Sequence, residues 1–251
     1  MEPWQLLLLA LVGAVSGFIN VMAGGGSLLT VPILLFMGIP GPVANGTNRI
    51  AILAQNLTAV VTFFRRGYSD FKLSLSLAAC SIPGAVAGAL VGARLDGVWF
   101  NRTIAAIMLG VMLVMWLDRG NAGATVPSTT PPRKRLWWGH LLMVGVGFYG
   151  GFIQLGVGFI IMPVLHRVLG FDLIHTNMHK VFIIGCYTPV ALLVFATQVQ
   201  MLWLVGLVLA IGNSTGGWLA ARVQIKQGEN IVKKVLYAVL LVFIVKLLFF
   251  S

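Results

Sequence analysis

The chain has 251 residues, of which 59% are hydrophobic and only 9% are charged. A soluble domain of this length needs more charge to cover its surface, and long apolar runs recur along the sequence, so the composition predicts a protein of membrane-spanning helices. The net charge of +11 would suggest nucleic acid in a soluble protein, but these basic residues lie mainly between apolar runs, which predicts contact with membrane lipids and no nucleic-acid partner.

The apolar runs come in two series. The first comprises residues 4–22, 28–37, 50–64, 73–91 and 104–117. A polar loop rich in Gly, Pro, Ser and Thr follows at 119–135. The second series comprises residues 136–153, 159–169, 181–197, 201–221 and 231–250. The pattern predicts two repeats, 1–118 and 136–251, each with about five apolar segments.

Matching residues support the repeat. An offset of 131 positions places Gly25 on Gly156, Pro32 on Pro163 and Arg49 on Lys180; a slightly smaller offset aligns the glycines of 84–88 with those of 212–216. If each repeat crosses the membrane an odd number of times, the two repeats are inverted relative to each other.

Loop charge predicts the orientation. With Arg65, Arg66 and Lys72 in the cytoplasm, the loop 119–135, Arg167, Lys180 and the basic residues of 222–234 also fall inside. The loop around 198–200 is uncharged and falls outside. This arrangement fits inverted repeats with both termini outside.

Each repeat opens with a broken apolar segment. The polar and glycine residues of the breaks are Asn20, Gly24, Gly25, Gly26 and Ser27 in the first repeat, and Gln154, Gly156 and Gly158 in the second. The short runs that follow span only about 15 Å as helix, half a hydrocarbon core, and Pro32 and Pro163 interrupt them further. Glycines at this depth serve either close helix packing or an unwound turn whose N–H groups bind an anion.

A polar cluster precedes the third run of each repeat. Its candidate site residues are Asn48, Arg49 and Gln55 in the first repeat, and Asn177, His179 and Lys180 in the second. A cation at membrane depth is costly and suggests function. The alternative is that Arg49 and Lys180 anchor helix ends by reaching the lipid headgroups.

The placement of the six carboxylates favours an anionic substrate, because all of them lie at run ends or in loops. A cation path or metal site needs acidic or carbonyl-rich ligands at depth. We therefore expect no metal and no cofactor, and no motif supports catalysis. If transport is coupled to protons, His179 is the candidate titrating group. Cys80 and Cys186 are interpreted as buried small residues; a thiol carrier with one cysteine in each half is the alternative.

Three motifs carry a family resemblance: Gly-Phe-Ile-Asn at 17–20, the glycine-rich run with Pro32 at 24–32, and Ala-Asn-Gly-Thr-Asn-Arg at 44–49. With them, nearly the whole chain resembles the TauE/SafE family of sulfite exporters and sulfonate permeases. The resemblance implies a bacterial inner-membrane permease with two homologous halves that moves sulfite, sulfoacetate or a related sulfonate. The sequence departs from the family at 178–180, where a Thr-Ser type pattern is often seen.

The sequence thus predicts an all-α, polytopic membrane protein of two inverted-topology repeats, with broken or short helices near the start of each. The predicted function is alternating-access transport of a small sulfur oxyanion or organic sulfonate. An anion channel and a non-transporting assembly or redox partner are the alternatives. Whether the short segments cross the membrane or re-enter, and whether the chain forms a homo-oligomer, stay open.

Overall fold

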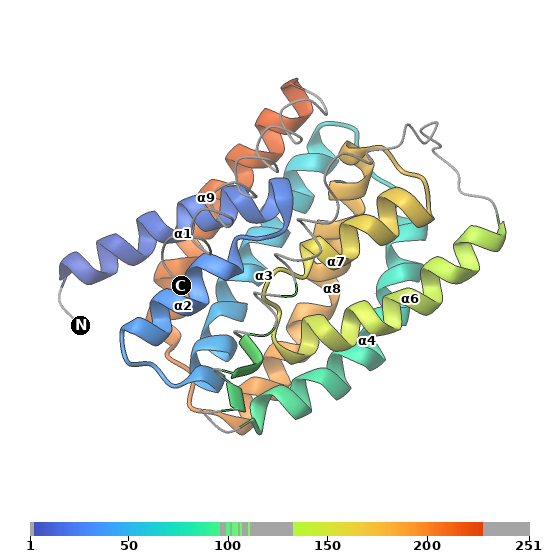
Figure 1. Cartoon of the computed structure of the whole chain (residues 1–251). Coiled ribbons are helices and arrows are strands. Elements are labelled where there is room, and N and C mark those ends of the chain that lie inside the picture. Colours follow the sequence, from blue (N-terminus) through green and yellow to red (C-terminus); the bar gives the residue numbers. More distant parts are fainter. Residues whose placement is uncertain are drawn as a thin grey trace.

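The computed structural model describes residues 3–95, 99, 100, 102–104, 106, 110 and 133–227, and the regular elements described are all helical (Figure 1). They are α1 (Pro3–Ala23), α2 (Ser27–Phe36), α3 (Gly41–Arg65), α4 (Phe71–Ala93), α6 (Arg133–Phe152), α7 (Gly158–Pro163), the π-helical turn η1 (Val164–Val168), α8 (Leu173–Gln198) and α9 (Trp203–Gln227). The predicted runs 231–250 and most of 104–117, and the loop up to 132, lie outside the described residues.

Four of the helices are long and apolar enough to cross a membrane: Trp4–Ala23 in α1, Phe71–Ala93 in α4, Leu173–Gln198 in α8 and Trp203–Lys226 in α9. Helix α3 is equally long but too polar to join them, and most of its polar side chains are buried inside the protein. A polar helix in that position is shielded from lipid by its neighbours.

The two broken segments fold back on themselves. After α1 the chain turns at Gly24–Gly26, and Gly26 packs so closely that a Cβ there would lie 2.0 Å from the carbonyl oxygen of Ser16. After α6 the chain turns at 154–157, and Leu169, beyond η1, packs against Gly139 near the start of α6. Helices α2 and α7–η1 therefore return toward the ends from which α1 and α6 began (Figure 1).

Glycine seams join the helices into two bodies. A Cβ on Gly212 of α9 would lie 2.0 Å from the carbonyl oxygen of Ala10, and a Cβ on Gly88 of α4 would lie 2.0 Å from that of Phe148. Such seams bring α1 against α9 and α4 against α6 at backbone distance. We call α1, α2, α3 and α9 the first body, and α4, α6, α7, η1 and α8 the second body; they lie side by side in Figure 1 and meet along α3 and α8.

Each body contains one helix from the other half of the chain. Helix α9 belongs to the second half but packs on α1 and α3, and α4 belongs to the first half but packs on α6 and α8. The two exchanges are reciprocal: the fourth helix of each half packs on the first and third helices of the other.

Both α3 and α8 begin about eight residues before the apolar runs that predicted them, at Gly41 and Leu173 rather than at positions 50 and 181. The polar clusters that precede those runs form the first turns of each helix, because their side chains find buried partners. Pro32 lies inside α2 without ending it, whereas Pro163 is the last residue of α7 before the π-helical turn.

Candidate anion site at the two breaks

The two breaks meet in the middle of the molecule. A Cβ on Gly24 would lie 2.2 Å from Cα of Gly158, and one on Gly158 would lie 2.1 Å from Cα of Gly24. The Ser27 hydroxyl donates to the carbonyl oxygen of Gln154 at 3.3 Å and accepts from the amide of Gly156 at 3.2 Å. Close packing therefore explains Gly24 and Gly158, and Ser27 ties one break to the other.

Arg49 is completely buried and reaches from the first body into the second. Its Nη1 donates to the carbonyl oxygen of Gly150 at 2.9 Å, and its Nη2 donates to that of Gly151. Nη1 also lies 3.4 Å from Oε1 of Gln154, and the guanidinium covers the ring of Phe195 at 4.5 Å. Arg49 thus binds the C-terminal carbonyls of α6, where a cation is electrostatically favoured.

Lys180 makes the reciprocal contact from the second body into the first. Its Nζ donates to the carbonyl oxygens of Asn20 at 3.1 Å and Val21 at 2.8 Å, at the end of α1. Asn20 and Gly151 are separated by the same 131 positions as Arg49 and Lys180. Since both side chains are buried, the alternative that they reach the lipid headgroups is wrong.

The positive charges of Arg49 and Lys180 are only partly offset at the breaks. Among the residues that the structure describes, the ion pair is that of Asp172 with His175, and no carboxylate pairs with Arg49 or Lys180. A helix C-terminus carries about half a negative charge, so two such ends offset roughly one of the two positive charges. The two helix ends would therefore offset only part of the charge that Arg49 and Lys180 carry when both are ionised.

Several buried hydrogen-bond donors around Arg49 have no acceptor. They are Nδ2 of Asn48, Nε of Arg49 and Nε2 of Gln154. The amides of Gly25 and Gly26, which are also buried, donate to none of the described residues. A buried donor without a partner costs about 1–3 kcal/mol. Oδ1 of Asn177 and Oδ1 of Asn213 are likewise buried without a donor among the described residues. An oxyanion would satisfy the unpaired donors around Arg49 but not these two oxygens.

Three further predicted site residues, Asn20, Asn177 and His179, have different neighbours. Asn20 donates to Oε1 of Gln55 at 3.3 Å, close to the end of α1. Asn177 donates to the carbonyl oxygen of Met22 at 3.2 Å. His179 instead has its described contacts with Ser74 and Phe171, on the side of α8 that faces α4.

Sequence reasoning missed four polar residues of the same region. Thr30 donates to Oδ1 of Asn48 at 2.9 Å, Asn213 donates to Gln55 at 3.4 Å, and Gln224 accepts from Asn177 at 2.9 Å. Tyr187, whose hydroxyl lies close to Gly150 and to the side chain of Gln154, is fully buried. Thr30 is a lone polar residue in an apolar run, and that isolation at membrane depth was an available signal. Gln224 lies beyond the run 201–221, between Arg222 and Lys226, and carried no such signal.

The described residues contain no group of three or more His, Cys, Asp or Glu side chains that could hold a metal ion. Cys80 and Cys186 are free and partly buried. The chemistry available at the breaks is therefore binding by donors and positive charge.

Comparison with known proteins identifies the family. The model of the sulfite exporter TauE/SafE family matches residues 9–247. A probable membrane transporter protein of Sinorhizobium is 28% identical over 98% of this chain and 93% of its own length. A probable membrane transporter protein of Haemophilus influenzae is 28% identical over 91% of this chain and 88% of its length, and the probable membrane transporter protein YfcA of Escherichia coli is 26% identical over all of this chain and 92% of its length.

No solved structure matches the chain significantly. The family model nevertheless covers almost all of the sequence, including both breaks and both buried cations. The chain belongs to the TauE/SafE family of membrane transporters, which is not a family of enzymes.

Proposed function

We propose that the protein transports a small sulfur oxyanion or organic sulfonate across the bacterial inner membrane, and that the substrate binds where the two breaks meet. The observation that carries this proposal is a pair of buried basic residues, Arg49 and Lys180, that have no carboxylate partner among the residues the structure describes. Burying uncompensated charge is costly unless something pairs with it. An anion is the ligand that gains most from such a site.

The unpaired donors favour an oxyanion over a simple halide. Nε of Arg49, Nε2 of Gln154 and Nδ2 of Asn48 are donors on three different side chains, and a sulfite or sulfonate group has several oxygens that could accept from them. The Tyr187 hydroxyl near Gly150 is a further donor on the same side. Gly25 and Gly26 add amides that precede the N-terminus of α2, where a negative charge is favoured.

Transport then follows from movement of the two bodies. Arg49 lies two turns inside the start of α3, and Lys180 lies two turns inside the start of α8. The Arg49 contact with α6 would close the site toward the outside, and the Lys180 contact with α1 would close it toward the cytoplasm. Breaking one contact at a time gives alternating access. The reciprocal packing of α4 and α9 supports two inverted repeats.

The described basic residues support the orientation. Arg65, Arg66 and Lys72 lie between α3 and α4, Arg135 lies at the start of α6, and Lys226 lies at the end of α9. Parallel packing of α9 with α3 and of α6 with α4 brings these termini to one end of the molecule. By the positive-inside rule this end is cytoplasmic. In this orientation the α1–α2 hairpin enters from outside and the α6–α7 hairpin enters from the cytoplasm.

Uptake into proteoliposomes tests the proposal. Purified protein should give saturable uptake of sulfite or a sulfonate, and an excess of unlabelled anion inside should accelerate uptake by counterflow. Flux that neither saturates nor shows counterflow would indicate an anion channel. If sulfite, sulfoacetate and a simple sulfonate neither cross the membrane nor compete with one another, the result would contradict the proposal and favour a non-transporting partner protein.

Substitutions of Arg49 separate charge from anchoring. Arg49→Gln should abolish uptake, whereas Arg49→Lys should retain part of it because the positive charge is kept and the fork is lost. Arg66→Gln, at an exposed position in the cytoplasmic loop, is the matched control and should transport normally. Full activity in both Arg49 variants would show that the residue has only a structural role.

A further inference from the structure

A second polar cluster lies on the face of α8 next to the one that carries Lys180, because consecutive helical residues project about 100° apart. The ring of His179 is buried against the ring of Phe171, with 4.5 Å between centroids, and its Nδ1 lies 2.7 Å from the hydroxyl of Ser74 on α4. His179 immediately precedes Lys180 in the sequence, so one turn of α8 carries both groups. A serine hydroxyl can accept from a protonated imidazole or donate to a neutral one, so this bond survives a change of charge.

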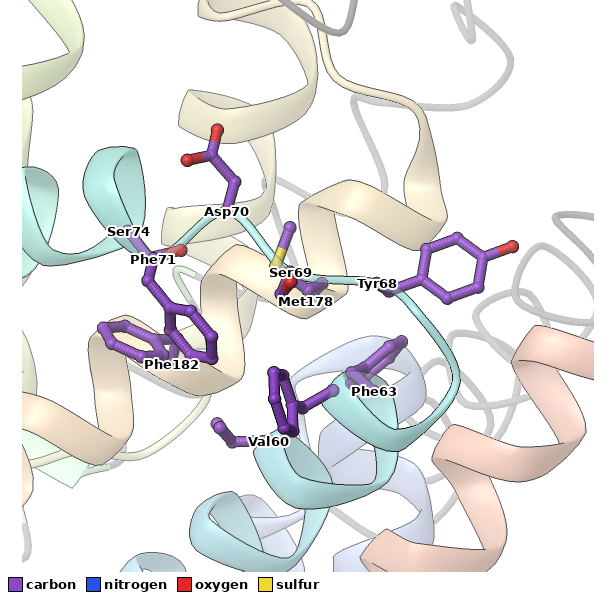
Figure 2. A pocket seen from close by; sticks show the side chains of 10 residues that line it. Val60, Phe63, Tyr68, Ser69, Asp70, Phe71, Ser74, Met178 and Phe182 are labelled. Atoms are coloured by element: carbon purple, nitrogen blue, oxygen red, sulfur yellow. The ribbon is translucent and has the colours of Figure 1, made fainter.

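Ser74 lines a small cavity beside the loop between α3 and α4. Figure 2 shows it between the last turn of α3, the loop 66–70 and α8, with Ser69, Asp70 and Ser74 among its lining residues. Aromatic side chains of the same loop and helices form its walls (Figure 2). Its volume for the centre of a water-sized sphere is about 10 Å³, the size that admits a single water molecule.

The carboxylates of the described residues gather at this cluster. Of the six carboxylates in the chain, the two that the structure describes are Asp70 and Asp172. Asp70 lines the cavity and caps α4 by accepting from the amide of Leu73 at 3.1 Å. Asp172 caps α8 and lies 2.6 Å from Nδ1 of His175, one turn before His179. Two acidic groups in an otherwise basic protein mark a path that attracts protons.

The other charged neighbours of His179 also lie at the cytoplasmic end. Burial opposes ionisation of Asp172, but hydrogen bonds from His175 hold the pKa of that carboxyl below its ordinary value, so it is a charged partner at neutral pH. The ring of His175 packs on that of Tyr68 at 5.7 Å. Behind Phe171, His166 bonds the carbonyl oxygen of that residue, and Arg135 approaches Gly170. Arg65 and Arg66 are exposed.

From this placement we infer that His179 is the site of a coupling proton, which enters from the cytoplasmic end past Asp70 and Ser74. The inference rests on the proposed anion transport. Protonation of His179 would add a positive charge to the turn of α8 that carries Lys180 and so raise the affinity for an anion at the breaks. Binding of the anion would raise the affinity for the proton by the same factor. Proton and anion would then move together.

Transport with controlled pH gradients tests the inference. The probe is a simple sulfonate such as methanesulfonate, because its own charge is constant over the pH range used. Wild-type protein should accumulate the sulfonate against its gradient when a pH gradient is imposed. His179→Gln cannot take up a proton, so it should lose pH-driven accumulation by at least about tenfold while counterflow at equal pH on both sides persists.

The chain offers a matched control in a second His–Ser pair. His140 of α6 is hydrogen-bonded to Ser76 of α4, away from the cavity. His140→Gln should keep the full response to the pH gradient. Asp70→Asn, which keeps the cap of α4, should shift the pH dependence of uptake to lower pH. An unchanged response in His179→Gln would overturn the inference while leaving anion transport intact.

Titration of the His179 imidazole tests the proton site even if the protein transports no anion. In detergent-solubilised protein with labelled histidine, the His179 resonance should change with pH as the imidazole takes up a proton, and Asp70→Asn should lower the midpoint of that change. Addition of methanesulfonate should raise that midpoint. An imidazole that stays neutral throughout, with and without the sulfonate, would overturn the proton site. Absence of transport together with a normal titration would contradict only the proposed function.

Discussion

Replacing Arg49 by methionine should destabilise the protein strongly. Methionine keeps most of the volume against Phe195, but it leaves the carbonyl oxygens of Gly150 and Gly151 without the guanidinium that binds them. Each charged hydrogen bond contributes about 1.5–3 kcal/mol. Removal of one partner from a buried charged contact costs about 3–5 kcal/mol. We therefore expect a loss of about 3–5 kcal/mol, since the two bonds are made by one side chain.

The corresponding measurement is the melting temperature of the detergent-solubilised protein, read as loss of the monodisperse peak in size-exclusion chromatography after heating. For a chain of this length the expected loss corresponds to a decrease of roughly 6–20 °C. Arg49→Lys should lose about half as much, because it keeps the charge and one bond. The exposed control Arg66→Met should melt like wild type. An Arg49→Met protein that melts within about 2 °C of wild type would refute the assignment of Arg49 as the residue that binds α6 to the first body.

Three further predictions follow from close contacts and unpaired groups. Gly24→Ala and Gly158→Ala should each reduce both uptake and melting temperature, because the new Cβ would lie 2.2 or 2.1 Å from the facing Cα. The control is Gly145→Ala, where a Cβ meets nothing within 4 Å. Equal behaviour of all three variants would contradict the packing of the breaks. Tyr187→Phe removes a hydroxyl that lies against Gly150 and the side chain of Gln154, so it should lower the melting temperature only slightly while raising KM for the sulfonate roughly tenfold; an unchanged KM would exclude Tyr187 from the site. Gly88→Ala should lower the melting temperature in the same assay by overpacking the α4–α6 seam, at a cost of about 1–3 kcal/mol, and an unaltered melting curve would show that the seam is not tight.

The sequence predicted the helices well where the residues are apolar, because lipid and the protein interior both favour apolar side chains. The runs 4–22, 73–91, 136–153 and 201–221 correspond to α1, α4, α6 and α9 with small differences at the ends. Their apolar character identifies a membrane helix whichever neighbour covers it. The breaks were predicted from glycine content, because three consecutive glycines are unusual in a membrane helix.

The starts of α3 and α8 could not be read from hydropathy. The polar residues near these helix starts look like loop residues in the sequence: Asn45, Arg49, Asn177 and Lys180. Their partners are backbone carbonyls on other helices, and a sequence does not show which carbonyls will be available as partners. The exchange of α4 and α9 was equally hidden. Gly212 signals a close approach but does not say which helix approaches.

The exchanged position of α9 has a consequence for biosynthesis. Helix α1 leaves the ribosome first, yet the backbone that covers Gly13 and Gly17, around Leu209 and Asn213, is made near the end of translation. Throughout synthesis of the residues in between, that glycine face has no native partner and is exposed to lipid or to the insertion machinery. The first half released alone would lack the helix that completes its body. Expression of residues 1–135 without the remainder should therefore yield a chain that proteases of the membrane degrade quickly, and co-expression of residues 136–251 should protect it.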